Sequence, residues 1–294
     1  MSFSFIFQLL INGIIAGAIY SLISSGFSLI YNTNKFINFS HGAVIVLSAY
    51  FAYIFFNIVG LPFMLAAGLS ITTTIFFGLF VMKFVYNPLR KKGASNAVLL
   101  IASVAILIMI ENILLLLFGA TVKKYPLFDA SESIEFAGAI ITKLEIIIVL
   151  SSLLLLAFLY IFLKKSNFGK KLQAISDEPH LAESIGIPSK KLQAFAIALA
   201  SLIAGIAGIL IGLEYKIEPS MGTRLMISGF SGAVVGGVST VLGSILGAFI
   251  VGILENLGIG FLPSAYKNAI SFILLFVFLL LKPSGLFGKK EEKL

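Results

Sequence analysis

Seven stretches of the sequence are apolar and long enough to cross a lipid bilayer as helices. A helix needs about 20 apolar residues, with a range of roughly 17–25, to cross ~30 Å of hydrocarbon. The stretches are Phe5–Tyr31, Gly42–Val59, Pro62–Val85, Ala97–Gly119, Leu144–Leu163, Leu192–Leu213 and Ala265–Leu281. The sequence therefore predicts an all-α integral membrane protein, built as a polytopic helical bundle.

Composition excludes the other common classes of protein. Hydrophobic residues make up 59% of the chain and charged residues 12%, whereas soluble proteins have about 45–50% and about 25%. This excludes an ordinary cytosolic enzyme, a disordered chain and a nucleic-acid-binding domain. The sequence has no Cys, and its two His, His41 and His180, are far apart. We therefore expect no metal site.

The sequence also lacks the motifs of nucleotide binding and of common catalytic centres. Gly-x-x-x-x-Gly-Lys-Ser/Thr, His-Glu-x-x-His and Gly-x-Ser-x-Gly are all absent. We therefore expect no enzymatic activity, no catalytic residue and no cofactor on this chain. If nucleotide drives its function, another chain binds the ATP.

An eighth apolar segment, Leu225–Leu254, is interrupted by small residues. The interruptions are Gly232, Gly236, Gly237, Ser239, Gly243, Ser244 and Gly247. The segment could form one long span, a re-entrant hairpin or two short crossings. Irregular backbone at membrane depth is tolerated only inside protein or beside a watery cavity, so we expect the segment to be central.

Lys and Arg predict the orientation, because cytoplasmic loops carry an excess of them. The 83–92 loop, the 164–191 loop and the C-terminal tail contain most of these cations, and the net charge of +8 reflects this bias. With these segments inside, the N-terminus is outside and the C-terminus is cytoplasmic. One long span over Leu225–Leu254 would contradict this arrangement. We favour two short crossings, hence about eight or nine spans, with the re-entrant hairpin as the alternative.

Small residues share one face of the first predicted span. Gly13, Gly17, Ser21, Ser24 and Ser28 fall within a sector of about 80° at 100° per residue. Small residues let helices pack closely in lipid, which is the simpler interpretation of this face. The alternative is that Ser21, Ser24 and Ser28 lie near a polar substrate pathway.

Two polar interruptions are further candidates for that pathway. The first is the run Ile37-Asn38-Phe39-Ser40-His41-Gly42, in which Ser40 is a plausible helix N-cap. Capping does not require His41, so Asn38 and His41 could serve a gate or a substrate path. The second is Glu111, two-thirds along the fourth span, where an ionisable group is costly and marks a functional candidate. The alternatives for Glu111 are snorkelling or an interhelical hydrogen bond.

The 164–191 loop is predicted to contain two short helices joined near Asp177. Asp177 can cap the second helix, and Gly186 is a natural stop. Leu181, Ala182 and Ile185 would form one apolar face, which on a cytoplasmic protrusion requires a partner. The alternative is a helix lying on the lipid surface, since the loop has six Lys. The acids Asp177, Glu178 and Glu183 oppose adhesion to anionic lipid.

Several motifs, by their order and spacing, resemble those of the permeases of bacterial branched-chain amino acid ABC importers. Asn38-Phe-Ser-His-Gly42 resembles the family's Asn-Phe-Ala/Ser-His-Gly signature, and Glu111-Asn112 falls where the family tends to have Gln-Asn. Gly169 to Ile187 is similar to its coupling loop, and Val234-Val-Gly-Gly237 to its glycine-rich late segment. Lys282-Pro-Ser-Gly-Leu-Phe-Gly288 resembles its C-terminal motif. These motifs extend over nearly the whole chain.

The resemblance implies a fold like that of vitamin-importer-type ABC permeases. It implies one transmembrane permease domain over residues 1–288 and a cytoplasmic tail over 289–294, in the bacterial inner membrane. The implied partners are a second, similar permease, two ABC ATPase subunits that bind the ATP, and an extracytoplasmic substrate-binding protein. The coupling residues that it implies are Gly169, Ala174, Asp177, Glu178, Leu181, Ala182, Ile185 and Gly186.

The function that follows is translocation of branched-chain or related hydrophobic amino acids. A urea or amide ABC permease and an ion-coupled secondary transporter are the alternatives. The secondary transporter should show buried coupling acids, which are scarce in the predicted spans. A passive channel would give flux without any energy source.

Overall fold

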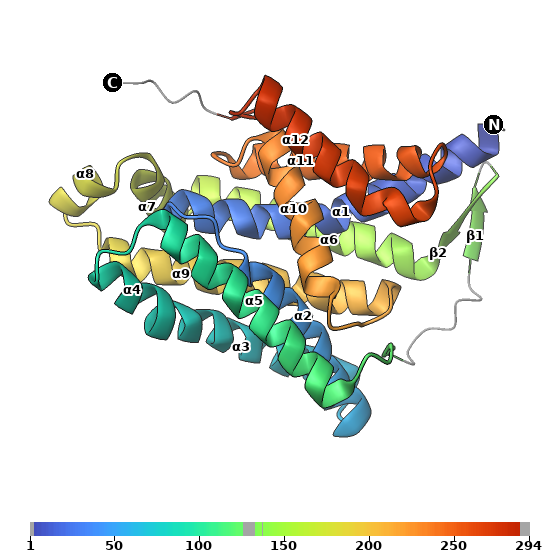
Figure 1. The fold of residues 1–294 in the computed structure, drawn as a ribbon, viewed down its shortest axis with the longest axis horizontal. Coiled ribbons are helices and arrows are strands. Elements are labelled where there is room, and N and C mark those ends of the chain that lie inside the picture. The colour runs from blue at the N-terminus through green and yellow to red at the C-terminus, as the bar shows by residue number, and fades with distance from the viewer. Residues whose placement is uncertain (1–2, 126–132, 137, 289–294) are drawn as a thin grey trace. The chain divides into compact units, whose positions relative to one another are not determined.

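A computed structural model describes residues 3–125, 133–136 and 138–288, and these residues are mostly helical (Figure 1). The N-terminal half contains α1 (Phe3–Asn34), α2 (Ser40–Tyr53), η1 (Ile54–Ile58), α3 (Phe63–Val81), η2 (Met82–Tyr86), α4 (Asn87–Lys91) and α5 (Asn96–Phe118). The strands β1 (Ser133–Phe136) and β2 (Ala139–Thr142) and the helix α6 (Lys143–Lys165) follow. The remaining helices are α7 (Asn167–Asp177), α8 (Pro179–Ser184), α9 (Ser189–Glu214), α10 (Met221–Gly236), α11 (Val241–Ile259), η3 (Ser264–Tyr266) and α12 (Lys267–Leu281).

The long helices coincide with the predicted spans. Seven helical stretches of the described residues are long and apolar enough to cross a membrane: Ser4–Asn34, Ser40–Ile58, Phe63–Lys91, Asn96–Phe118, Lys143–Lys165, Ser189–Glu214 and Val241–Ile259. The shorter apolar helix α12 matches the last predicted span. The π-helical turns η1 and η2 extend α2 and α3 without a break. The prediction of an all-α polytopic membrane protein is confirmed.

The glycine-rich segment is broken into two helices. α10 ends at Gly236 and α11 begins at Val241. Gly237, between them, has a φ of +108°, a region that L-residues with a side chain rarely adopt. The 16 residues of α10 rise about 24 Å, which is less than the ~30 Å of the hydrocarbon core. The break lies among the small residues that interrupt the segment in the sequence, while the number of crossings here stays a prediction.

The chain divides into two compact units, which are described separately. The first comprises Met1–Ser28, Tyr125–Leu156 and Arg224–Leu294, and the second comprises Leu29–Lys124 and Ala157–Thr223. Both units are built from segments that are distant in sequence. The prediction of a single permease domain over residues 1–288 stays a prediction.

Close approach of helix backbones holds the first unit together. A Cβ added to Gly13 would lie 2.7 Å from Ile253 Cα, and one added to Gly252 would lie 2.5 Å from the backbone N of Gly17. α1 and α11 therefore pack at backbone contact. α10 also packs against α1, where Gly229 lies in close contact with the Ile23 side chain. Because lipid tails are as apolar as Leu, such van der Waals contact is a main source of helix association in a bilayer.

A C-terminal segment completes the end of α10 in the same unit. The backbone N–H groups of Leu286 and Phe287 donate to the carbonyls of Val235 and Gly236, each at 2.9 Å. Helix ends leave carbonyls without intrahelical partners, and these two bonds satisfy two of them. The Lys282–Gly288 motif therefore supports the glycine break.

A hairpin of β1 and β2 also belongs to the first unit (Figure 1). Ser133 pairs with Thr142 and Phe136 with Ala139 in antiparallel register. Gln8 of α1 holds the second strand, because its side chain accepts from the N–H of Ile140 at 2.7 Å and donates to the Ile140 carbonyl at 3.0 Å. The sequence analysis predicted no strand here.

The second unit is centred on α2, which packs against α9, α3 and α5. A Cβ on Gly208 of α9 would lie 2.3 Å from the Ile45 carbonyl oxygen of α2. The Ser48 hydroxyl of α2 donates to the Gly205 carbonyl at 2.7 Å, and the Ser70 hydroxyl of α3 donates to the Ser48 carbonyl at 2.7 Å. Three helices are thus joined by close contact and by buried hydroxyls.

Candidate pathway residues and coupling loop

The three candidate serines of α1 all donate hydrogen bonds to backbone carbonyls within the first unit. The hydroxyl of Ser21 donates to the Ile245 carbonyl at 3.0 Å, that of Ser24 to the Gly229 carbonyl at 2.5 Å, and that of Ser28 to the Val238 carbonyl at 2.9 Å. All three serines are fully buried. The small-residue face therefore joins α1 to the glycine-rich segment, while the assignment of these serines to a pathway stays a prediction.

Asn38 lies at the centre of a buried polar cluster in the second unit. Its Oδ1 accepts from the backbone N–H of Ser40 at 3.1 Å, from the Ser40 hydroxyl at 2.7 Å and from the Tyr86 hydroxyl at 2.8 Å. Tyr86 lies at the end of η2, so the cluster fixes the start of α2 against a distant segment. The prediction that Ser40 is the N-cap is wrong: α2 begins at Ser40, its N-cap is Phe39, and no side chain caps it.

His41 occupies the first turn of α2 and is 1% exposed. The next residue, Gly42, lies against the start of α10. A Cβ on Gly222 would lie 2.8 Å from the Gly42 carbonyl oxygen and 3.2 Å from Glu111 Oε1. The structure therefore brings the end of the Asn38–Gly42 motif, the acidic residue of α5 and the start of α10 to one place. We call this place the Gly42–Glu111–Gly222 junction.

Glu111 accepts hydrogen bonds from the first turn of α10. Its Oε1 accepts from the backbone N–H of Thr223 at 2.7 Å, and its Oε2 accepts from the Thr223 hydroxyl at 2.8 Å. A carboxylate is favourable at this position, because the first N–H groups of a helix lack partners and carry partial positive charge. The interhelical hydrogen bond, one of the alternatives for Glu111, is thus present. Its place in a pathway stays a prediction.

Removal of the Glu111 carboxylate should destabilise the protein. We expect Glu111→Ala to lower the free energy of unfolding by about 1–2 kcal/mol, as loss of a capping side chain does, and Glu111→Gln to cost less because its carbonyl still accepts from Thr223. Thermal unfolding of the purified protein measures both. Asn112→Ala is the matched control, since exposed Asn112 bonds only along its own helix, to the Ile108 carbonyl. Equal melting temperatures for Glu111→Ala and the control would contradict the capping role.

Sequence reasoning missed Tyr86 and Thr223, which hold Asn38 and Glu111. Tyr86 follows an apolar run and has no pattern that separates it from a lipid-facing aromatic residue. Thr223 stands two residues into a helix whose start was not predicted. A threonine just ahead of the apolar Leu225–Leu254 segment was the available signal.

The 164–191 loop folds into the two predicted helices, α7 and α8, joined at Glu178. The Ser166 hydroxyl caps α7 by accepting from the Gly169 N–H at 2.9 Å. A Cβ on Gly169 would lie 2.3 Å from the Leu163 carbonyl oxygen, so this residue packs against the end of α6.

At the other end of α7, the Ala174 carbonyl accepts from the Glu178 N–H at 3.0 Å. Asp177 ends α7, and the predicted cap of α8 by Asp177 is wrong, because its N-cap is Glu178.

α8 ends at Ser184, just before the predicted stop at Gly186. Gly186 has a φ of +85°, its N–H donates to the Glu183 carbonyl, and the Ile187 N–H donates to the Ala182 carbonyl, both at 3.0 Å. This pair of bonds is a Schellman motif, which favours glycine at the left-handed position.

The apolar face of α8 is smaller than predicted. Leu181 is 63% exposed and Ile185 is 70% exposed, but Ala182 is 2% exposed and packs inward. We call Leu181 and Ile185 the docking ridge. The loop lies outside the candidate spans of the described residues.

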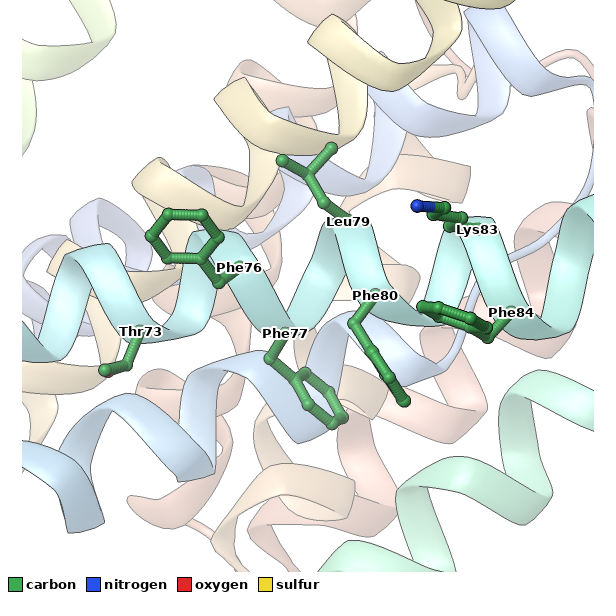
Figure 2. A pocket seen from close by; sticks show the side chains of 7 residues that line it. All are labelled: Thr73, Phe76, Phe77, Leu79, Phe80, Lys83 and Phe84. Atoms are coloured by element: carbon green, nitrogen blue, oxygen red, sulfur yellow. The ribbon is translucent and has the colours of Figure 1, made fainter.

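A shallow hollow runs along α3 and η2 in the second unit (Figure 2). It is lined by Thr73, Phe76, Phe77, Leu79, Phe80, Lys83 and Phe84, all from one continuous helical stretch. Phe76, Phe80 and Phe84 are more than half exposed. A binding site gathers a few convergent polar groups, whereas this lining has an aromatic majority typical of a lipid-facing surface. We assign it no site.

Among the described residues, no group of three or more His, Asp or Glu could hold a metal ion.

Comparison with known proteins gives the family. Residues 9–279 match the family model described as branched-chain amino acid transport system / permease component. The chain is 29% identical to the high-affinity branched-chain amino acid transport system permease protein BraD of Pseudomonas aeruginosa, over 97% of this chain and 96% of the relative. It is 29% identical to LivH of Escherichia coli strain K12, over 98% and 97%. A probable LivH of Methanocaldococcus jannaschii is 31% identical, over 98% and 94%.

The match extends over nearly the full length of both chains. The residues that match the family model, 9–279, cover the Asn38–Gly42 motif, the 164–191 loop and the glycine break of this chain. The relatives are transport permeases, and the described helices include seven candidate spans. The chain is a multi-pass membrane protein and belongs to the branched-chain amino acid transport system permease family.

Proposed function

We propose that this chain is the membrane-spanning permease subunit of an ABC importer for branched-chain or related hydrophobic amino acids. The observation that carries the proposal is the match to permeases of branched-chain amino acid transport, which extends over at least 94% of each chain. The relatives' names give the substrate class. The docking ridge adds physical support, because exposed Leu181 and Ile185 on a polar loop require a protein partner.

The proposed assembly has three further subunits and one delivery protein. The sequence has no nucleotide-binding motif, so two separate ATPase subunits supply the energy and the permease holds no cofactor. A second, similar permease completes the membrane part, and an extracytoplasmic binding protein delivers the substrate. The excess of Lys and Arg in the 83–92 and 164–191 loops supports a cytoplasmic location for them, with the N-terminus outside and the C-terminus inside.

In this mechanism, closure of the ATPases moves α7 and α8, and the permease halves rock between inward-facing and outward-facing states. Substrate released by the binding protein enters a pathway for which the proposed residues are Ser21, Ser24, Ser28, Asn38, His41 and Glu111. The residues proposed for coupling are those of α7 and α8 named above, with Leu181 and Ile185 in contact with the ATPase.

Purification of the tagged chain from its native membrane in mild detergent tests the proposal. We expect a second permease and two P-loop ATPases to co-purify, and the reconstituted complex with its binding protein to take up leucine only with ATP. Uptake of urea in place of leucine would retain the ABC assembly but change the substrate. Purification of the chain alone, with transport in liposomes without ATP, would refute the proposal, and an ion-gradient requirement would then indicate a secondary transporter.

A further inference from the structure

The junction between α1 and α2 is fastened to several segments of the second unit. The Arg90 guanidinium donates to the Asn34 carbonyl and lies over the Phe36 ring, with its Cζ 5.2 Å from the ring centroid. The Gln193 amide of α9 donates to the Thr33 carbonyl at 3.3 Å. The junction is therefore held in position by residues of distant helices.

Lys35 has an unusual backbone conformation at this junction. Its φ is +57°, and within residues 3–125, 133–136 and 138–288 it is the one non-glycine residue with positive φ. Its N–H donates to the Tyr31 carbonyl at 2.8 Å and ends α1. Gly, and sometimes Asn, usually occupies such a left-handed position, because a side chain makes it unfavourable. A lysine in this left-handed conformation costs conformational free energy relative to glycine. We infer that its side chain makes a contribution that glycine cannot make.

The side chain of Lys35 contacts the coupling loop. Its Nζ donates to the backbone carbonyl of Ser176, the residue before the last of α7. Carbonyls in the last turn of a helix lack intrahelical partners, and a cation there is favourable. The hydroxyl of Ser176 also donates to Asn32 Oδ1 of α1, at 3.4 Å. The carbonyl and the hydroxyl of Ser176 therefore both bond to side chains at the end of α1, those of Lys35 and Asn32.

α7 can transmit a displacement through this contact. Leu172 and Ile175 are buried and hold one face of the helix, and α8 with the docking ridge follows directly after Glu178. Lys35, the donor of the bond to Ser176, is exposed. Three residues further along the chain, the Asn38 side chain accepts hydrogen bonds from Ser40 and Tyr86. One lysine therefore links the loop that would dock the ATPase to the motif that would line the pathway.

We propose that Lys35 is a positioning residue that couples movement of α7 and α8 to the α1–α2 junction. The inference rests on the proposed function, because it requires that α8 docks an ATPase. Lys35 has no contact with ATP or substrate in this mechanism. Loss of its ammonium should leave ATP hydrolysis in place but separate it from transport.

Three variants of Lys35 test the proposal. Lys35→Asn tolerates the left-handed backbone but is too short to contact Ser176, and Lys35→Gly removes both the strain and the side chain. Lys35→Arg keeps a cationic donor of similar length. In proteoliposomes containing the complete transporter, we expect the first two to lower amino acid uptake per ATP hydrolysed at least fivefold, with hydrolysis within twofold of wild type. Lys35→Arg should keep the ratio within twofold.

Hydrogen exchange of the isolated permease provides a second readout that needs no ATPase. We expect the amides in the last turn of α7 to exchange faster in Lys35→Asn than in Lys35→Arg. Unchanged exchange would show that the contact is absent, and faster exchange with a wild-type transport ratio would show that it does not couple; either result overturns the proposal. If wild type itself shows no ATP-dependent uptake, the proposed function fails first, and the coupling role of Lys35 fails with it.

Discussion

Leu181→Asp should abolish ATP-driven uptake by the assembled transporter. Leu181 is 63% exposed on α8, so most of its side chain lies outside the packed interior of the permease. If the side chain enters an apolar cleft of the ATPase, an unpaired carboxylate there loses its hydration without compensation. A loss of about 2 kcal/mol, the threshold for an interface hot spot, corresponds to roughly 30-fold in affinity. Pull-down of the ATPases and uptake of labelled leucine measure the two consequences.

Glu183→Ala is the matched control for Leu181→Asp. Glu183 is exposed on the same six-residue helix, and its carbonyl bond to the Gly186 N–H does not depend on its side chain. We expect ATPase recovery and uptake with Glu183→Ala to stay close to wild type, and Ile185→Asp to resemble Leu181→Asp. Intact uptake with Leu181→Asp would show that α8 is not part of the surface that docks the ATPase, even if the permease still bound ATPases through other residues.

Span positions could be predicted from the sequence because each span is a continuous apolar run of sufficient length. The helix break near Gly237 and the helix end at Gly186 were equally accessible, since both depend on a local backbone conformation that glycine adopts easily. The two short helices of the coupling loop followed from the same kind of local signal. These features do not depend on which other segment lies nearby.

Features that depend on contacts between distant segments were not predicted. The Thr223 partner of Glu111 lies 112 residues away, and the Tyr86 partner of Asn38 lies 48 residues away. The support of α10 by Leu286 and Phe287 is similar, because the Lys282–Gly288 motif gives no local indication of where it packs. In the almost uniformly apolar spans, hydrophobic periodicity distinguishes neighbouring helix faces poorly.

The small-residue face of α1 had two interpretations, and the contacts favour packing. Each of Ser21, Ser24 and Ser28 donates to a carbonyl of the glycine-rich segment. A buried hydroxyl in such a bond is satisfied and joins two helices, so a substrate would have to displace it to use it. The second unit offers the polar groups of the Gly42–Glu111–Gly222 junction, which makes Glu111 and His41 the first residues to test by uptake.

Gly247→Ala should be among the most destabilising single-methyl changes in the first unit. A Cβ at Gly247 would lie 2.3 Å from the Gly232 carbonyl oxygen and 2.3 Å from the backbone N of Gly236. Both neighbours are backbone atoms of α10, so no side chain can rotate away and the helices must separate. Overpacking in a tight core costs about 1–3 kcal/mol and occasionally more. We expect a loss of at least 2 kcal/mol in the free energy of unfolding, seen as a lower melting temperature and lower yield of the purified protein.

The same methyl group added at Gly68 separates packing from helix propensity. Gly68 is an exposed glycine inside α3, and a Cβ there would meet no atom within 4 Å. In water, Ala favours a helix over Gly by about 1 kcal/mol, so Gly68→Ala should leave the melting temperature unchanged or slightly higher. Since both substitutions gain the same propensity, the difference between them measures the backbone contact between α10 and α11. Equal melting temperatures would mean that the glycine-rich helices do not pack at backbone distance, and that these glycines serve the helix break alone.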